Sequence, residues 1–338
     1  MSDRAAILAA FREYANKPAT AHELRAEAGE TFSAPPFQQL RQVLQSLASK
    51  AELDELLGQL AELIPGADPF RASALALNCG SLIEAGGDPA RLAPHFLAAL
   101  PRHLALAQRA SETTFDADPD AHRAQAGLTF LMLATMAVIC RKAEYRQTAR
   151  ANPDIASRVE SLRDTNREAD YVAQVLGFTD DLDLVILAPN EMKGFRVRCD
   201  AVASCAHLMT LLQAALIGGE HLSGEPLDPE VVGVATGEAP HARLLHDHAR
   251  FNFVSWSGEV DNGIDSLITM PVEETPRYVT ALDGQRIVLV GPPVLAGRSW
   301  DSNFFANIHD ALKSRAEIVE VLSEAEVRRW LERIQAAR

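Results

Sequence analysis

The chain has 338 residues, of which 47% are hydrophobic and 23% charged, so two folded domains are expected and long disordered stretches are not. Its net charge of -14 disfavours nucleic acid and anionic membrane surfaces as partners, because both bind basic faces. Residues 1–17 contain no apolar signal core, so we expect a cytoplasmic protein.

Helix-start signals fill the first half. Thr20 and Glu23 have the spacing of a capping box and predict a helix that Gly29 closes. Leucines at helical spacing then run through residues 36–64. Periodicity does not decide between one long helix there and two helices separated near Ser49 and Lys50.

Four later starts share one pattern, in which a capping side chain precedes a proline at the first helical position. They are Asp68-Pro69, Asp88-Pro89, Asp118-Pro119 and Asn152-Pro153. The segments between them are unequal and carry no recurring signature. This favours an irregular helical bundle over a repeat solenoid.

Residues 127–140, GLTFLMLATMAVIC, form the most apolar run in the chain. The run carries no charge and is too short for a membrane span. A helix that is apolar on all sides must be covered on all sides, so we interpret it as the central helix of the bundle. Its Thr129 and Thr135 hydroxyls are expected to bond the carbonyls one turn earlier.

Cys79, Cys140, Cys199 and Cys205 are scattered and form no CxxC pair, which predicts buried thiols rather than a disulfide frame or a zinc site. We expect no cofactor. Lys142, Arg146 and Arg150 recur at helical spacing, and the acidic residues among and after them favour a solvated face over a phosphate site.

The composition changes near residue 180. Residues 184–187 read as a buried strand, and residues 195–199 alternate apolar and polar side chains, which predicts a β-hairpin. Arg196 and Arg198 lie on its wet face. Residues 203–217 then predict an apolar helix containing His207, which we interpret as a core or boundary histidine.

The last third predicts a strand at residues 286–290, a helix over 302–312 and a strand at 318–322. This order implies a right-handed parallel crossover, with any ligand at the loop of residues 291–302. The predicted fold class is therefore α+β: a mainly helical domain over residues 1–179, then a smaller mixed α/β domain over 180–338 with a hairpin and a parallel β-α-β crossover.

His241, His246 and His248 are the candidate metal ligands. On a strand, His246 and His248 would point to the same side, as a chelating pair requires. On a helix that begins at Pro240 they would not. A metal-assisted hydrolase with its site around these histidines is the alternative function.

The preferred function is a non-catalytic cytoplasmic binding factor, of a regulatory, adaptor or immunity type, that recognises another protein through the C-terminal domain. Catalytic motifs are missing, and aromatic residues concentrate in this region. Such aromatics form either the local core, which is the favoured interpretation, or an anchor surface for a partner. The partner-binding candidates are Arg250, Trp256, Arg298, Trp300 and Asp301. The sequence leaves open whether the protein is an enzyme, which residues would be catalytic, and whether it forms a homo-oligomer.

Overall fold

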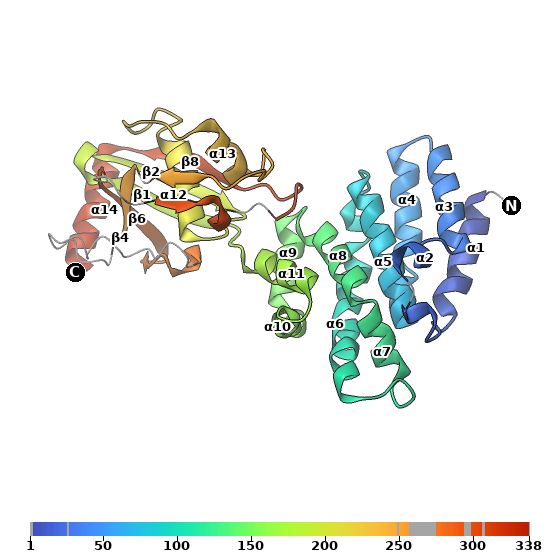
Figure 1. The fold of residues 1–338 in the computed structure, drawn as a ribbon. Coiled ribbons are helices and arrows are strands. Elements are labelled where there is room, and N and C mark those ends of the chain that lie inside the picture. The colour runs from blue at the N-terminus through green and yellow to red at the C-terminus, as the bar shows by residue number, and fades with distance from the viewer. Residues whose placement is uncertain are drawn as a thin grey trace. The chain divides into compact units, whose positions relative to one another are not determined.

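The computed structural model describes residues 3–25, 27–248, 250–256, 275–293, 299–305 and 308–337. Contacts divide the chain into two compact units, Met1–Leu176 and Gly177–Arg338, named here the helical unit and the sheet unit. Figure 1 shows helices alone in the first and a mixed sheet with helices in the second. The predicted α+β class is confirmed.

The helical unit is built from short helices that begin at capping side chains. Their bounds are α1 Asp3–Asn16, α2 Ala28–Thr31, α3 Pro35–Ser46, α4 Lys50–Ala61, α5 Pro69–Glu84, α6 Ala93–Arg109, α7 Pro119–Ala126, α8 Leu128–Ile139, α9 Ala143–Ala151, α10 Pro153–Leu162 and α11 Arg167–Gly177. Within the described chain, no helix combines the length and apolarity needed to cross a membrane.

The four capping signals before proline all form. Asp68, Asp118 and Asn152 accept hydrogen bonds from backbone N–H groups in the first turns of α5, α7 and α10. Asp88 caps only the 3-10 turn Pro89–Arg91, and α6 begins after it. Local capping therefore marks where each turn begins but does not set its length.

Residues 36–64 form two helices. α3 ends at Ser46, and Ser49 caps α4 by accepting from the Glu52 N–H. The box of Thr20 and Glu23 also forms, with the Thr20 N–H donating to Glu23 Oε2 at 2.8 Å. The helix predicted there is wrong, because the box opens only the 3-10 turn Glu23–Arg25, ahead of the one-turn α2.

Helix α8 holds most of its side chains in the core, as the apolar run predicts, but Leu133 is exposed and Phe130 is half-buried. The expectation of cover on all sides is therefore wrong for one edge of the helix. The Thr135 hydroxyl bonds the Leu131 carbonyl at 2.8 Å as predicted, whereas Thr129 instead accepts from Asn166 Nδ2 at 3.3 Å.

The sheet unit contains a mixed sheet in the order β4-β6-β1-β2-β8, with β5 added beside β6, and a separate ribbon of β3 and β7. The strands are β1 Leu182–Ala188, β2 Lys193–Asp200, β3 His246–His248, β4 Phe251–Ser255, β5 Ala281–Leu282, β6 Gln285–Pro293, β7 Ser299–Asp301 and β8 Arg315–Leu322. The helices are α12 Cys205–Leu216, α13 Pro229–Thr236 and α14 Glu324–Ala337.

Alternate residues of β1 enter two different cores. Leu184 and Ile186 pack in the same cluster as residues of α12, while Val185 and Leu187 pack with Val327, Trp330 and Ile334 of α14. Since side chains alternate between the faces of a strand, α12 and α14 cover opposite faces of the sheet. Figure 1 labels both helices beside it.

The predicted hairpin forms from β1 and β2, with Leu184 opposite Val197. The parallel pair is β1 with β6, whereas the crossover was expected between β6 and β8. In the sheet β1 and β2 separate β6 from β8. The α-helix predicted over residues 302–312 is also wrong: in the described part of that stretch, the 3-10 turn Ser302–Phe304 replaces it.

Candidate functional site

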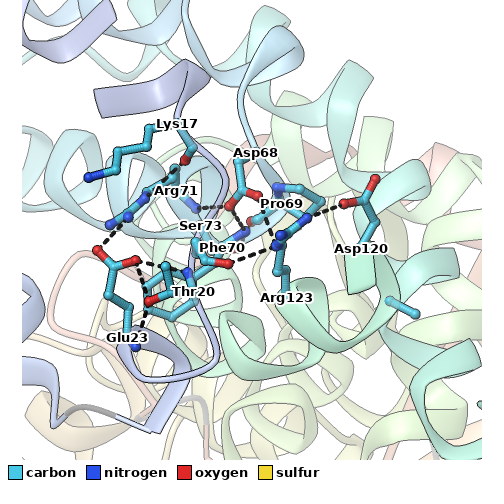
Figure 2. Close-up of polar contacts among 12 residues, drawn as sticks. Lys17, Thr20, Glu23, Asp68, Pro69, Phe70, Arg71, Ser73, Asp120 and Arg123 are labelled. Atoms are coloured by element: carbon cyan, nitrogen blue, oxygen red, sulfur yellow. Dashed lines mark hydrogen bonds and ion pairs between the residues drawn. The ribbon is translucent and has the colours of Figure 1, made fainter. Parts of the chain in front are cut away.

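The helical unit contains a partly buried ion network, drawn in Figure 2. Arg71, only 4% exposed, pairs with Glu23 at 2.6 Å and lies 4.4 Å over the Tyr14 ring. Arg123 pairs with Asp68 at 3.3 Å and with Asp120 at 2.9 Å. The guanidinium groups of α5 and α7 thus connect these two helices to each other, to α1 and to the 3-10 turn at Glu23.

These two arginines also hold the chain between α1 and the 3-10 turn at Glu23. Arg71 Nε donates to the Lys17 carbonyl and Arg123 Nε to the Ala19 carbonyl, at 3.4 and 2.9 Å. Burial raises the pKa of the Glu23 carboxyl, but hydrogen bonds from Thr20 and Arg71 outweigh it and lower that pKa to about 2. Because each charge faces a fixed partner, the network is best understood as a structural clasp.

In the sheet unit, one stripe of α12 is polar and buried. Ser204, at the N-cap, donates to the Phe304 carbonyl at 2.8 Å. His207 accepts from the Ala203 N–H at Nδ1, and its Nε2 lies 2.7 Å from the Ala235 carbonyl. Burial lowers the pKa of His207 to about 4, so the neutral imidazole is the core histidine that the sequence suggests.

The same stripe continues through Thr210 and Gln213, at the three-residue spacing of one helix face. Thr210 Oγ1 donates to Asp247 Oδ2 at 2.7 Å, and Trp300 Nε1 donates to Thr210 Oγ1 at 3.0 Å. Gln213 Oε1 accepts from the Arg250 N–H. The stripe thus holds the β3-β7 ribbon against α12 through buried polar bonds.

Asp247 is the residue of this ribbon that sequence reasoning missed. It lies between two exposed histidines and is itself only 3% exposed. Burial raises the pKa of its carboxyl, against the hydrogen bonds from Thr210 and the His248 N–H. Because side chains alternate along a strand, Asp247 points to the face opposite to that of His246 and His248. The sequence could not show this, since it left open whether these residues form a strand or a helix.

The three candidate metal ligands do not come together. His246 and His248 point to the same exposed side of β3, opposite Asp301 and Ser299 of β7. His241 Nε2 instead lies 2.5 Å from the buried Ser302 hydroxyl. Among the described residues, no three His, Cys, Asp or Glu side chains are placed to share a metal ion.

The partner-binding candidates lie in varied surroundings. Trp300 is 4% exposed and its indole N–H donates to Thr210, so it takes the core position that the sequence offers as the alternative to a binding surface. Trp256 is half-buried against the α14 core. Arg250 Nε donates to the Glu225 carbonyl, and Asp301 caps the turn at Asn303. Arg298 lies outside the described residues.

Charged side chains cover part of the sheet face beside α14. Arg196 pairs with Glu320 at 2.9 Å, and Arg198 pairs with Asp183 at 3.2 Å. Both arginines lie on the wet face expected from the alternation of β2. Each faces a carboxylate of a neighbouring strand, so these pairs stabilise strand pairing only modestly at this exposure.

Strand β8 leaves an apolar edge exposed. It ends the order of the described sheet and pairs only with β2. Val319 is 50% exposed and Val321 is 60% exposed, so both are among the large apolar side chains that the described part of the chain leaves in solvent. Apart from the pairing with β2, no backbone hydrogen bond joins residues 316–321 to a described element. Among the described residues, nothing pairs with the outer backbone groups of β8, which can therefore accept a further strand.

The sequence carried a signal for this edge. Glu317 and Glu320 interrupt the apolar residues of the strand, and charge within a strand is typical of edges. Val319 has no register partner, because the pairing with β2 shifts there by one residue. The valines were missed because the expected parallel crossover placed this strand beside residues 286–290, inside the sheet.

No family model, curated protein or solved structure matched the chain in the three comparisons.

Proposed function

We propose that this protein is a non-catalytic binding factor that recognises another protein through its sheet unit, by adding an extended segment of that partner to the free edge of β8. The observation that carries the proposal is the exposure of Val319 and Val321 on β8, a strand that has a neighbour on only one side within the described sheet. Strand addition supplies main-chain hydrogen bonds for affinity and side-chain contacts for specificity.

The charge around β8 indicates the chemistry of the partner. The larger share of the chain's acidic excess lies in residues 177–338, and Glu317 and Glu320 belong to β8 itself. Two copies of β8 pairing with each other would bring these carboxylates close together, which is unfavourable. A partner segment that alternates apolar residues with lysine or arginine meets the valines and the Glu317 carboxylate, while Glu320 already pairs with Arg196.

The proposal includes a regulatory, adaptor or immunity-type role in the cytoplasm. All four cysteines lie in the described part of the chain as buried thiols, which is compatible with a reducing compartment. The hydrolase alternative is not carried forward, since the described residues bring together neither a metal-binding cluster nor the three histidines that motivated it.

A peptide-binding measurement tests strand addition. The probes are a short labelled peptide alternating lysine with valine, its glutamate counterpart, and a version with a central proline. We expect the lysine peptide to bind at least about tenfold more tightly than either other probe. Binding should protect the amides of residues 315–322 from hydrogen exchange and should weaken with added salt.

The matched variants are Val319→Glu/Val321→Glu on β8 and Leu244→Glu, which changes an exposed leucine of the same unit outside the strands. The double variant should lose binding by about tenfold or more, and Leu244→Glu should keep it. Equal binding of all three peptides, or binding that survives the double variant, contradicts the proposal. Self-association that the double variant abolishes would identify a second copy as the occupant and also contradict it.

A further inference from the structure

The helical unit has an apolar groove between α3 and α5, at the start of α4. Two adjoining hollows of 490 and 370 Å³ share Leu44, Leu82 and Ala85 as lining residues. The large apolar side chains along the groove that remain half-buried are Phe32, Leu44, Leu47, Leu53 and Leu77. Half-buried apolar side chains that gather in one groove, rather than lying singly on the surface, mark a candidate interaction site.

The groove exists because α3 packs on α1. The Phe37 ring lies 5.2 Å from the rings of both Phe11 and Tyr14, which fixes one face of α3. Leu44 of α3 and Leu47, which follows its last residue, line the hollow together with Leu82 of α5 without filling it. α3 then ends at Ser46, and the chain turns through Ser49 into α4, which closes one end of the groove.

The charged side chains that line these hollows are both basic. Arg41, exposed on α3, donates from Nη2 to the Phe32 carbonyl at 3.0 Å and has no carboxylate within ion-pair distance among the described residues. Lys50, at the start of α4, already pairs with Asp54 at 3.4 Å and donates to the Gly86 carbonyl. An acidic residue on an occupant therefore complements Arg41 at this rim.

We infer that the groove binds an amphipathic helix of another protein, whose apolar stripe enters the groove and whose flanking residues are acidic. The 12 residues of α3 span about 18 Å, the length of three helical turns. Leucines on neighbouring helical turns of the groove match anchors at i, i+3, i+4 and i+7 of such a helix. The walls are helices with satisfied backbones, so an extended strand has no edge to join.

This site is independent of β8, because it uses different residues in the other unit. The probe is a labelled amphipathic peptide of about 15 residues with leucines on one face and glutamates on the other, compared with its lysine counterpart. Fluorescence anisotropy with the full chain should show at least about tenfold tighter binding of the glutamate peptide. The bound peptide should become helical by circular dichroism.

Leu44→Glu should weaken this binding by about tenfold or more, and Arg41→Glu should reverse the preference toward the lysine peptide. Arg167→Glu, which changes an exposed arginine of α11 away from the groove lining, should leave it unchanged. Val321→Glu should also leave it unchanged, which separates this site from the β8 edge. Arg41 is exposed, so Arg41→Glu still tests the site if the Leu44→Glu variant does not fold.

Three results would overturn the inference. The first is equal affinity for the two peptides, or no binding of either. The second is binding that persists in both groove variants. The third is concentration-dependent self-association of the chain, seen by analytical ultracentrifugation, that Leu44→Glu abolishes, because a second copy would then be the occupant.

Discussion

Two buried histidines of this protein differ in whether their ring nitrogens have hydrogen-bond partners. His207 of α12 has hydrogen-bond contacts at both ring nitrogens. His103 of α6 is equally buried, yet neither of its ring nitrogens has a partner in the described chain. Burial lowers the pKa of both imidazoles to about 4, and Arg102 contributes at His103. Both are therefore neutral in the folded protein near neutral pH.

We predict that His103→Leu stabilises the helical unit and reduces its acid sensitivity. An apolar side chain removes a buried unsatisfied polar group, a gain of about 1–3 kcal/mol at neutral pH. The unfolded chain binds the His103 proton with an ordinary pKa near 6.5, above the folded value of about 4. Stability is therefore lost as pH falls from about 6.5 toward 4, and His103 accounts for about 2 kcal/mol between pH 7 and 5.

Urea unfolding followed by far-ultraviolet circular dichroism at these two pH values measures the effect. His22→Leu serves as the control, since His22 is exposed and its replacement should leave the pH dependence unchanged. An unchanged pH dependence in His103→Leu, or a loss of stability above 1 kcal/mol at neutral pH, would show that His103 is held by favourable contacts.

At the scale of elements, the polar stripe of α12 explains how the small β3-β7 ribbon is fixed. A two-stranded ribbon is marginal by itself and needs packing against another element. Thr210 supplies a hydroxyl to Asp247 and receives the Trp300 N–H, so one side chain connects α12 to both strands. The sequence predicts an α12 that is apolar nearly all round. Only the structure shows that its few polar side chains form hydrogen bonds to the ribbon.

We predict that Thr210→Val costs about 2–3 kcal/mol of unfolding free energy in the sheet unit, because the buried Asp247 carboxylate loses a hydrogen bond. Its pKa, already raised by burial, should rise further. The matched control is Thr236→Val in α13, whose hydroxyl bonds only carbonyls of its own helix, within one turn. Urea unfolding monitored by tryptophan fluorescence should separate the two variants, and equal stability would refute this role of Thr210.

At the scale of the whole molecule, each unit has its own core. All three tryptophans, Trp256, Trp300 and Trp330, belong to residues 177–338, so their fluorescence reports the sheet unit alone. We predict that residues 1–176 and 177–338 fold when produced separately. The tryptophan transition of the isolated sheet unit should match that of the full chain within about 1 kcal/mol. A separate unit without a cooperative transition would contradict this.

The sequence by itself determined the fold class, the starts of α5, α7 and α10, and the β1-β2 hairpin. The helix caps could be predicted because each capping side chain bonds a backbone N–H only two or three residues further along the chain. These caps are Asp68, Asp118 and Asn152. Buried positions such as His207 also follow from local apolar periodicity.

Only the tertiary structure decided which strand lies at the edge of the sheet and which polar groups meet in the core. β8 is exposed because β2, and not β6, is its neighbour, and that pairing joins residues more than a hundred positions apart. The sequence leaves Trp300 as either a core or a surface residue, and its bond to Thr210, 90 positions away, places it in the core. Contacts between distant residues depend on how whole elements pack, and no local pattern records that choice.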